Sequence, residues 1–273
     1  MAIPLEDNFA DIIGKAQRGL SISDNTVAAK TGLDVEAVLR LRAGHFNEEA
    51  ARKVAPVLDL DPDALAAIGN GKYAPAEIED FTGLDQFNTE FGDMTVNAYL
   101  AWDATSKEAA AFDTGGDCTG ILESLHTLRL NLRYIFLTHI HGDHVYDLDR
   151  LRERTGAPAF VSSRETMDGA ESIEAGREFP LGALKIGTRL TWGHARGGLT
   201  FVITGLDRPI AVVGDALFAG SMGGGMVSYA DALRTDREEI FTLPENTIIC
   251  PGHGPLTTVA EEKAHNPFFA GRV

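Results

Sequence analysis

A short run near the middle of the chain concentrates metal-binding side chains. Residues 138–144 read T-H-I-H-G-D-H, and they directly follow an apolar run at residues 134–137. Imidazole nitrogens and a carboxylate are the ligands that zinc and iron prefer in proteins. An apolar strand that ends in such a cluster places ligands at the edge of a sheet, where a cleft can form. We therefore predict a metal site at the end of this strand, in preference to a histidine-rich surface loop.

Three further ligand-type residues follow apolar segments later in the chain. His194, Asp215 and His253 each come directly after a glycine, which permits a sharp backbone turn at the end of a strand. Taken alone, each has an ordinary explanation, because a lone histidine is often structural and an aspartate after glycine is often a turn residue. Their repetition, in order after the first cluster, favours one composite site.

The composition limits the classes of partner. An apolar share of 44% and a charged share of 23% are ordinary for a globular protein. The net charge of −16 argues against nucleic acid or an anionic membrane as the main partner, because phosphates would be repelled. Residues 1–7 lack the basic start and apolar core of a secretory signal. We therefore expect a cytoplasmic protein with a small-molecule substrate, in which Cys118 and Cys250 are reduced, buried thiols.

The chain divides into two parts with different patterns. Residues 1–72 predict a small all-α domain, with Asp34 and Asn47 as helix caps and Pro62 at the first position of a last helix. The glycines at 69 and 71 predict a linker, and residues 73–273 predict a layered α/β domain. Strands are expected at residues 96–102, 109–112, 134–137, 159–162, 184–192, 200–203, 210–213 and 247–250, and helices at 121–128 and 236–243.

The ordered motifs resemble those of the metallo-β-lactamase-fold hydrolases across roughly residues 80–273. The matching segments are Asp113-Thr114-Gly115, the T-H-I-H-G-D-H run, Gly193-His194, Gly214-Asp215-Ala216-Leu217-Phe218 and Pro251-Gly252-His253-Gly254. The resemblance implies an αββα sandwich, preceded here by the small all-α domain, with metals held in loops at one edge of the two sheets. Within the family, the chain is most similar to the glyoxalase-II-like branch.

The resemblance also implies a division of the ligands between two divalent metal ions, with zinc expected and iron or manganese as alternatives. One ion would take His139, His141 and His194, the other would take Asp143, His144 and His253, and Asp215 would bridge both. Metal binding lowers the pKa of water from about 15.7 to about 7, so a metal-bound hydroxide can attack a carbonyl at neutral pH. Asp143, the candidate catalytic residue, or a metal-bound water would then shuttle the proton. We therefore expect an enzyme that hydrolyses a small ester, thioester or lactone.

Two loops depart from the family pattern. Residues 195–198 read A-R-G-G where the branch commonly has Thr-Pro-Gly, and residues 221–226 read S-M-G-G-G-M. The second loop is either an apolar substrate wall or a plain surface loop, and glutathione thioesters should not be assumed as substrates. Arg196, Tyr229 and His265 are further candidates for substrate contact, with surface or packing roles as their ordinary alternatives.

Two other functions stay open. A mononuclear iron oxygenase similar to the persulfide dioxygenases would use His139, His194 and Asp215 and leave the second site empty. Residues 26–44 resemble the helix-turn-helix of phage-repressor-type domains, which would suit a metal-dependent DNA-binding regulator. Residues 1–72 are nevertheless acidic, with eight Lys and Arg against eleven Asp and Glu. We therefore expect these helices to cap the active site or to form a homodimer rather than to bind nucleic acid.

Overall fold

A computed structural model describes residues 3–79 and 82–273 of the chain. Met1 and Ala2, which belong to the segment used above to argue against a secretory signal, lie outside the described residues, as do Asp80 and Phe81. Among the described residues, every helix is too short or too polar to cross a membrane. Cys118 and Cys250 are buried and free, as predicted.

The N-terminal part is helical, as predicted. Its helices are α1 (Phe9–Leu20), α2 (Asp24–Thr31), α3 (Val35–Arg42), α4 (Glu48–Val54) and α5 (Pro62–Gly69), with a 3-10 turn, η1 (Ala55–Leu58), before α5. Asn47 caps α4 by accepting a hydrogen bond from the Ala50 amide. Asp34 occupies the predicted N-cap position of α3, but its side chain accepts no capping hydrogen bond. The start of α3 is exposed, so water can satisfy its free amides instead.

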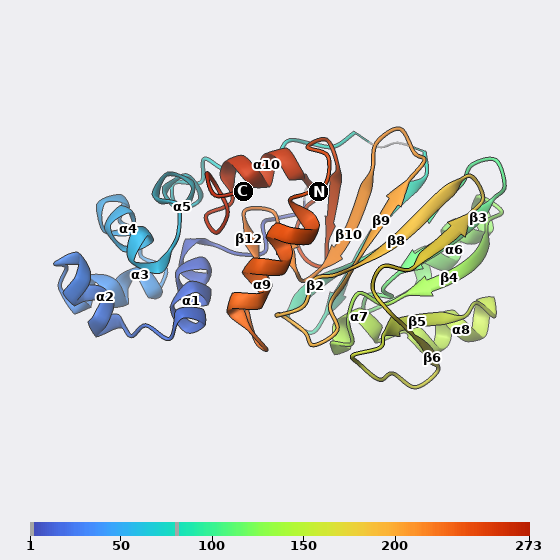
Figure 1. Cartoon of the computed structure of the whole chain (residues 1–273), viewed down its shortest axis with the longest axis horizontal. Coiled ribbons are helices and arrows are strands. Elements are labelled where there is room, and N and C mark those ends of the chain that lie inside the picture. Colours follow the sequence, from blue (N-terminus) through green and yellow to red (C-terminus); the bar gives the residue numbers. More distant parts are fainter. Residues whose placement is uncertain (1–2, 80–81) are drawn as a thin grey trace.

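The rest of the chain is a sandwich of two six-stranded sheets (Figure 1). In spatial order, the first sheet is β1 (Leu84–Phe91), β2 (Met94–Trp102), β3 (Glu108–Phe112), β4 (Asn131–Phe136), β5 (Ala159–Ser162) and β6 (Ala170–Ile173). The second is β14 (Thr257–Thr258), β13 (Ile248–Pro251), β10 (Ile210–Gly214), β9 (Leu199–Thr204), β8 (Leu184–Leu190) and β7 (Glu178–Leu181), and β11 (Leu217–Phe218) pairs with β12 (Ser221–Met222).

Helices cover both outer faces of the sandwich. Helices α6 (Thr119–Thr127) and α8 (Leu148–Thr155) pack on the first sheet, and α9 (Tyr229–Thr235) and α10 (Val259–His265) lie beside the second (Figure 1). Between the sheets, an aromatic core contains the stacked rings of Phe112 and Phe136. These layers confirm the predicted αββα arrangement. The helix predicted at 236–243 instead begins at Tyr229, because Ser228 caps it, and residues Asp236–Ile240 continue it as a π-helical segment.

Parallel strands bring the ends of several segments to one edge of the sandwich. Strand β3 pairs in parallel with β4, and β10 pairs in parallel with β13. The carboxyl ends of parallel neighbours lie at the same edge, so the loops that follow these strands meet there. The motif at 138–144 follows β4, and α7 (Gly142–Val145) forms within it.

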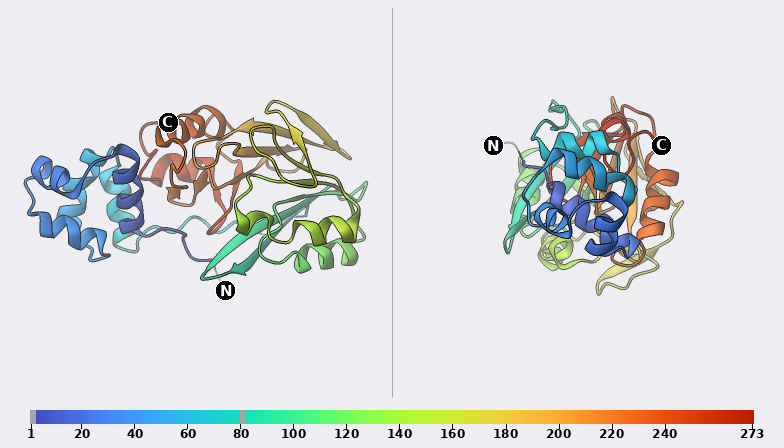
Figure 2. Two further views of the ribbon diagram at one scale, coloured as in Figure 1. Left: turned by 90° about the horizontal axis from the view of Figure 1, so that it is seen from below. Right: turned by 90° about the vertical axis from the view of Figure 1, so that its left-hand side faces the viewer.

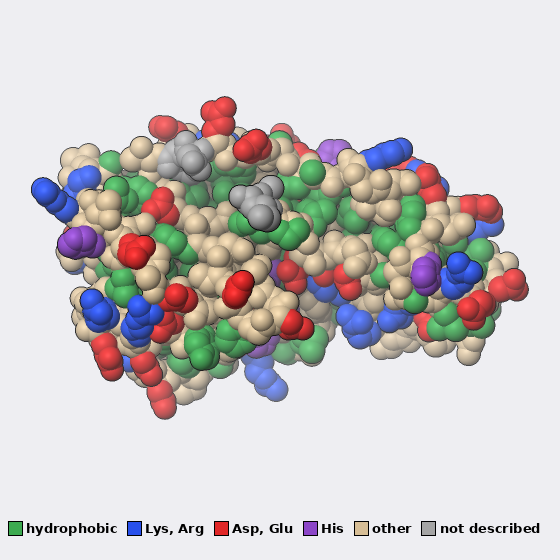
Figure 3. Space-filling model, turned by 180° about the vertical axis from the view of Figure 1, so that it is seen from behind, with side chains coloured by type: hydrophobic (Ala, Val, Ile, Leu, Met, Phe, Trp, Pro, Cys, Tyr) green, Lys and Arg blue, Asp and Glu red, His purple; other side chains and the backbone are tan. Residues whose placement is uncertain are grey.

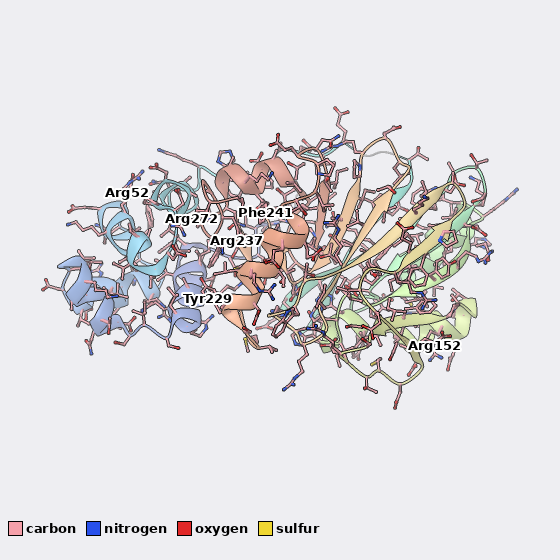
Figure 4. The ribbon with its side chains drawn as sticks, viewed as in Figure 1. Arg52, Arg152, Tyr229, Arg237, Phe241 and Arg272 are labelled. Atoms are coloured by element: carbon pink, nitrogen blue, oxygen red, sulfur yellow. The ribbon has the colours of Figure 1, made fainter. Side chains whose placement is uncertain are left out.

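The helical part and the sandwich share one apolar core. The same buried cluster contains Ile12 and Leu58 of the helices and Phe241 and Phe269 of the C-terminal part. At this boundary, Figure 4 shows Tyr229, Arg237, Phe241 and Arg272 on the side of the sandwich that faces the helices. A β-carbon on Gly19 of α1 would lie only 2.2 Å from the Tyr229 ring, so α1 and α9 are in close contact. The domain boundary at residue 72 therefore remains a proposal. It does not separate two hydrophobic cores.

Candidate metal centre

Four of the predicted ligands form one compact cluster, named here the first donor group: His139, His141, His194 and Asp215. Their donor atoms all lie within 4.8 Å of one another. The Nδ1 atom of His141 is 2.9 Å from Nε2 of His139 and 3.0 Å from Nε2 of His194. Ligands about 2.0 to 2.1 Å from a tetrahedral ion are about 3.4 Å apart. The group thus has nearly the spacing that one metal ion requires.

The remaining three predicted ligands form the second donor group: Asp143, His144 and His253. Nε2 of His253 lies 3.2 Å from a carboxylate oxygen of Asp143, and Nε2 of His144 lies 3.6 Å from the same oxygen. Asp215 stands between the two groups. Its Oδ2 is 3.3 Å from Nε2 of His194, and its Oδ1 is 3.2 Å from Nε2 of His144. This placement suits the bridging role that the sequence predicts for Asp215.

Outer contacts fix the orientation of the histidine rings. Nδ1 of His144 is 2.8 Å from Asp113, Nδ1 of His253 is 2.7 Å from the Thr95 carbonyl, and Nδ1 of His194 is 3.0 Å from the Gly224 carbonyl. A ring that donates from Nδ1 keeps Nε2 free to bind a metal. Each of these histidines therefore presents Nε2 to the cluster.

Asp113 also supports the strand that carries the motif. Its two carboxylate oxygens accept hydrogen bonds from the amide and the hydroxyl of Thr138, at 2.7 and 2.8 Å. Its φ of 58° lies in the left-handed region, which aspartate tolerates better than most residues. The sequence showed Asp113 only as part of a matching motif. Thr95 and Gly224 gave no signal, since any residue type can supply a carbonyl.

Two of the donor atoms lack a hydrogen-bond partner among the described residues of the protein. Within the described part of the chain, Nε2 of His144 and Oδ1 of Asp215 are buried and have no partner with hydrogen-bond geometry. A buried polar atom without a partner costs free energy, and a bound cation would satisfy both atoms at once. Histidine and carboxylate donors in this arrangement fit divalent metal ions such as zinc or iron.

The two groups differ in their affinity for protons. Burial lowers the pKa of His139 well below its usual value, and it also lowers the pKa of His194. Burial opposes charge on His144 as well, but the carboxylates of Asp215 and Asp113 raise its pKa to about 10. Hydrogen bonds to Asp143 and Asp215 likewise outweigh burial and raise the pKa of His253 to about 11. Without metal, His144 and His253 therefore hold protons at a pH where His139 and His194 do not.

The other candidate residues lie outside the cluster. The side chain of His265 is 53% exposed and sits near Glu261 on α10, Arg196 is exposed, and Tyr229 is buried against α1. The loop at 221–226 is not a wall of methionines, because Met222 is fully buried and Met226 is 76% exposed. In the view from behind, histidine side chains reach the surface near the middle of the molecule, between the helices and the bulk of the sandwich (Figure 3).

Known proteins with related sequences support the same architecture. Hydroxyacylglutathione hydrolase GloC of Haemophilus influenzae is 29% identical over 196 residues, which cover 63% of this chain and 92% of that protein. Probable metallo-hydrolase YqgX of Bacillus subtilis is 29% identical over 206 residues, covering 66% and 95%. The mitochondrial persulfide dioxygenase ETHE1 of Mus musculus is 33% identical over 186 residues, covering 62% and 69%.

The fold and the family agree with the sequence prediction. The crystal structure of BLEG-1 B3 metallo-beta-lactamase is 28% identical, has a TM-score of 0.61, and matches 69% of this chain and 100% of its own. Residues 91–253, which contain both donor groups, match the family model of the metallo-beta-lactamase superfamily. The N-terminal helices lie outside this match. The chain therefore belongs to the metallo-beta-lactamase superfamily, and its relatives include metallo-hydrolases.

Proposed function

We propose that the chain is a cytoplasmic, binuclear metal-dependent hydrolase that acts on a small ester, thioester or lactone. The observation that carries this proposal is the pair of donor groups, which meet at the shared carboxylate of Asp215. A shared carboxylate offsets the repulsion between two cations a few ångströms apart. Zinc is the metal we expect, with iron or manganese as alternatives.

When bound, the two ions would activate a water molecule and polarise the carbonyl oxygen of the substrate. The residues of the chain then have separate tasks. Each donor group would hold one ion, and Asp113, Thr95 and Gly224 fix the ring orientations. We infer that the Asp143 carboxylate would accept the proton that the attacking water loses. In the metal-free protein, the hydrogen bond from His253 and the charge of His144 outweigh burial and lower the Asp143 pKa.

A thioester suits this site best among the three substrate classes. A thiolate leaves with little acid assistance, because the pKa of a thiol is about 8.5. The site has no obvious general acid, so an easily displaced leaving group is favoured. The similarity to GloC, whose name describes the hydrolysis of a glutathione thioester, supports this choice. The unusual loops at 195–198 and 221–226 leave glutathione itself unassigned.

A mononuclear iron oxygenase is the second candidate, favoured by the 33% identity to persulfide dioxygenase ETHE1. It would use His139, His194 and Asp215 and leave the second donor group empty. The close spacing of Asp143, His144 and His253 favours two ions instead.

Metal analysis combined with a substrate panel tests these alternatives. The purified chain should hold about two ions and should hydrolyse members of a panel of thioesters, lactones and phosphodiesters. About one iron per chain with substrate-dependent oxygen uptake would establish the oxygenase instead.

We propose that the N-terminal helices cap the side of the sandwich that bears the metal centre. A homodimer through these helices is an alternative, since Val35 and Leu39 of α3 are 38% and 43% exposed, one helical turn apart. In that case Leu39→Glu should convert a dimer into a monomer in analytical ultracentrifugation. DNA binding is disfavoured by Asp34 and Glu36 at the start of α3. Salt-sensitive retention of generic duplex DNA at low salt would restore the regulator hypothesis.

A further inference from the structure

The segment before α1 connects the helical part with the metal centre. In Figure 2 (left), the chain runs from α1 back onto the sandwich. It packs closely on the loop that carries His253: a β-carbon on Gly254 would lie 3.2 Å from the Glu6 amide nitrogen and 3.6 Å from the Pro4 carbonyl oxygen. Residues 4–6 thus lie directly against a loop of the second donor group.

Asp7 and Lys15 form a buried ion pair that reaches from this segment into the sandwich. Their side chains are 7% and 14% exposed. The Lys15 ammonium also donates to the carbonyl of Met222 at 2.9 Å, and the Ser221 hydroxyl donates to the carboxylate of Asp7. Both residues of β12 are therefore held by the N-terminal part of the chain.

Strand β12 leads directly to the first donor group. A β-carbon on Gly223 would lie 1.8 Å from the carbonyl oxygen of Asp215, so the backbone here packs tightly on the bridging residue. The next residue, Gly224, accepts the hydrogen bond from Nδ1 of His194. The place of this carbonyl, and with it the orientation of the His194 ring, depends on where β12 is held.

We propose that Lys15 and Asp7 are positioning residues for the metal centre, and that they act through β12 and the Gly224 carbonyl on His194. This inference rests on the proposed function, because it requires that the donor groups bind metal. A buried ion pair stabilises a fold weakly, since desolvation of both charges opposes it. The hydrogen bonds to Met222 and Ser221 give this pair a geometric task that two apolar side chains could not perform.

The hydrogen bonds of Lys15 and Asp7 lead only to the first donor group. Residues 4–6 pack on the His253 loop, and the Glu6 carboxylate lies 4.0 Å from Nδ1 of His253. The ring orientations of the second group have other partners, because His253 is held by the Thr95 carbonyl of β2 and His144 by Asp113, directly after β3. Neither Thr95 nor Asp113 makes a hydrogen bond to Lys15 or Asp7. Lys15 lies over the Phe218 ring, which touches His253 at its edge, but it gives His253 no hydrogen bond.

The test compares zinc binding by variants of the full chain. In Lys15→Met/Asp7→Asn, both charges are removed together, so no unpaired buried charge remains. We expect one of two zinc ions to bind about 10- to 100-fold more weakly in chelator competition, the usual effect of losing an outer-shell partner. The other ion should bind as in the parent. The single variant Lys15→Arg keeps a charged donor. It should bind both zinc ions with nearly the affinity of the parent.

Arg272→Met is the matched control. Arg272, labelled in Figure 4, binds Asp59 across the same boundary, at 2.7 Å between the guanidinium and the carboxylate, and its hydrogen bond goes to the Asp59 carbonyl rather than to β12. The Arg272→Met variant should have a lower unfolding temperature and unchanged affinities for both zinc ions. If the double variant does not fold, the variant Ser221→Ala provides the test. We expect it to weaken binding of the same zinc ion, but by a smaller factor.

Two results would overturn the inference while the proposed function stands. One is that the folded double variant binds both zinc ions as tightly as the parent does. If the double variant does not fold, the same result for Ser221→Ala counts in its stead. The other is equal weakening by Arg272→Met. A parent chain that binds no zinc, iron or manganese would remove the proposed function and this inference together.

Discussion

The two donor groups are only a few ångströms apart, but they are built differently. In the second group, His144 is fully buried and His253 is 4% exposed, and their outer partners are Asp113, directly after β3, and the Thr95 carbonyl of β2. In the first group, His141 is exposed and His194 partly so, and a loop carbonyl at Gly224 orients His194. The sheet therefore preforms one half of the centre, while the other half depends on loops and on the helices that hold them.

The largest loss of metal and activity is expected from a change at Asp215, where the two donor groups meet. Asp215→Asn keeps the shape of the side chain but removes the charge that both ions would share. We expect loss of at least one ion and a fall in hydrolysis larger than the about 100-fold that the loss of an outer-shell partner costs. Metal content after gel filtration and the rate on the best substrate of the panel measure this. Asp231→Asn, a partly exposed change on α9, is the control. Two retained ions with full activity in Asp215→Asn would refute the bridging role.

A substitution in the glycine loop should disturb the first group and the bridging residue Asp215. In Gly223→Ala, the new methyl would lie 1.8 Å from the Asp215 carbonyl oxygen, so the backbone must move. We expect a loss of about 1 to 3 kcal/mol in the free energy of unfolding and weaker binding of one ion.

Gly224→Ala is the matched control for this loop. Its methyl would meet nothing closer than the Met226 sulfur at 3.6 Å, so the main chain need not move. Denaturant unfolding and zinc competition should separate the two variants. Equal behaviour would show that the loop is not tightly coupled to the first group.

A change at Asp113 should disturb the second group. Asparagine at position 113 can adopt the left-handed backbone of Asp113. Its amide has only one acceptor oxygen, however, so it cannot accept all the hydrogen bonds from His144 and Thr138. We expect about 10- to 100-fold weaker binding of the ion that uses His144, measured by chelator competition. Asp103→Asn also removes a carboxylate that accepts backbone hydrogen bonds, but far from the cluster. It should affect stability only, and a similar loss of metal affinity there would contradict the assignment.

The smallest expected effect is a pH dependence of stability that arises from the protons on the second donor group. With pKa values raised to about 10 and 11, His144 and His253 are charged in the metal-free protein at neutral pH. Their contribution to stability is complete below their ordinary pKa of about 6.5 and is lost as the pH rises toward 10 and 11. Denaturant unfolding of the metal-free chain at pH 7 and pH 9.5 should show this decrease.

The same protons must leave when the second ion binds. Calorimetry in two buffers of different ionisation enthalpy should detect the release of up to about two protons with that ion. The first ion should release few, because burial keeps His139 and His194 neutral. Equal proton release by both ions would contradict the difference between the groups.

Much of the fold could be predicted from local pattern. The strand at Ala159–Ser162 has the predicted bounds, and α3 and α4 begin where the sequence places them. Short or exposed elements such as β6, β11 and α7 were missed, since a few residues carry too little periodicity. The helix at Tyr229 was also missed, because its start depends on a cap at Ser228 that is not distinctive in a glycine-rich loop.

The sequence by itself identified the candidate donor residues, because the histidine and aspartate side chains of the 138–144 run and those after the glycines at 193, 214 and 252 have a chemistry that can be identified without coordinates. It also determined the superfamily, through the order of its motifs. Only the tertiary structure decided which carbonyls orient the rings and how the N-terminal helices reach the site. The physical reason is that a backbone carbonyl is the same in every residue, and the ion pair of Asp7 and Lys15 contacts residues more than 200 positions away. Such partners are set by the packing of the whole chain.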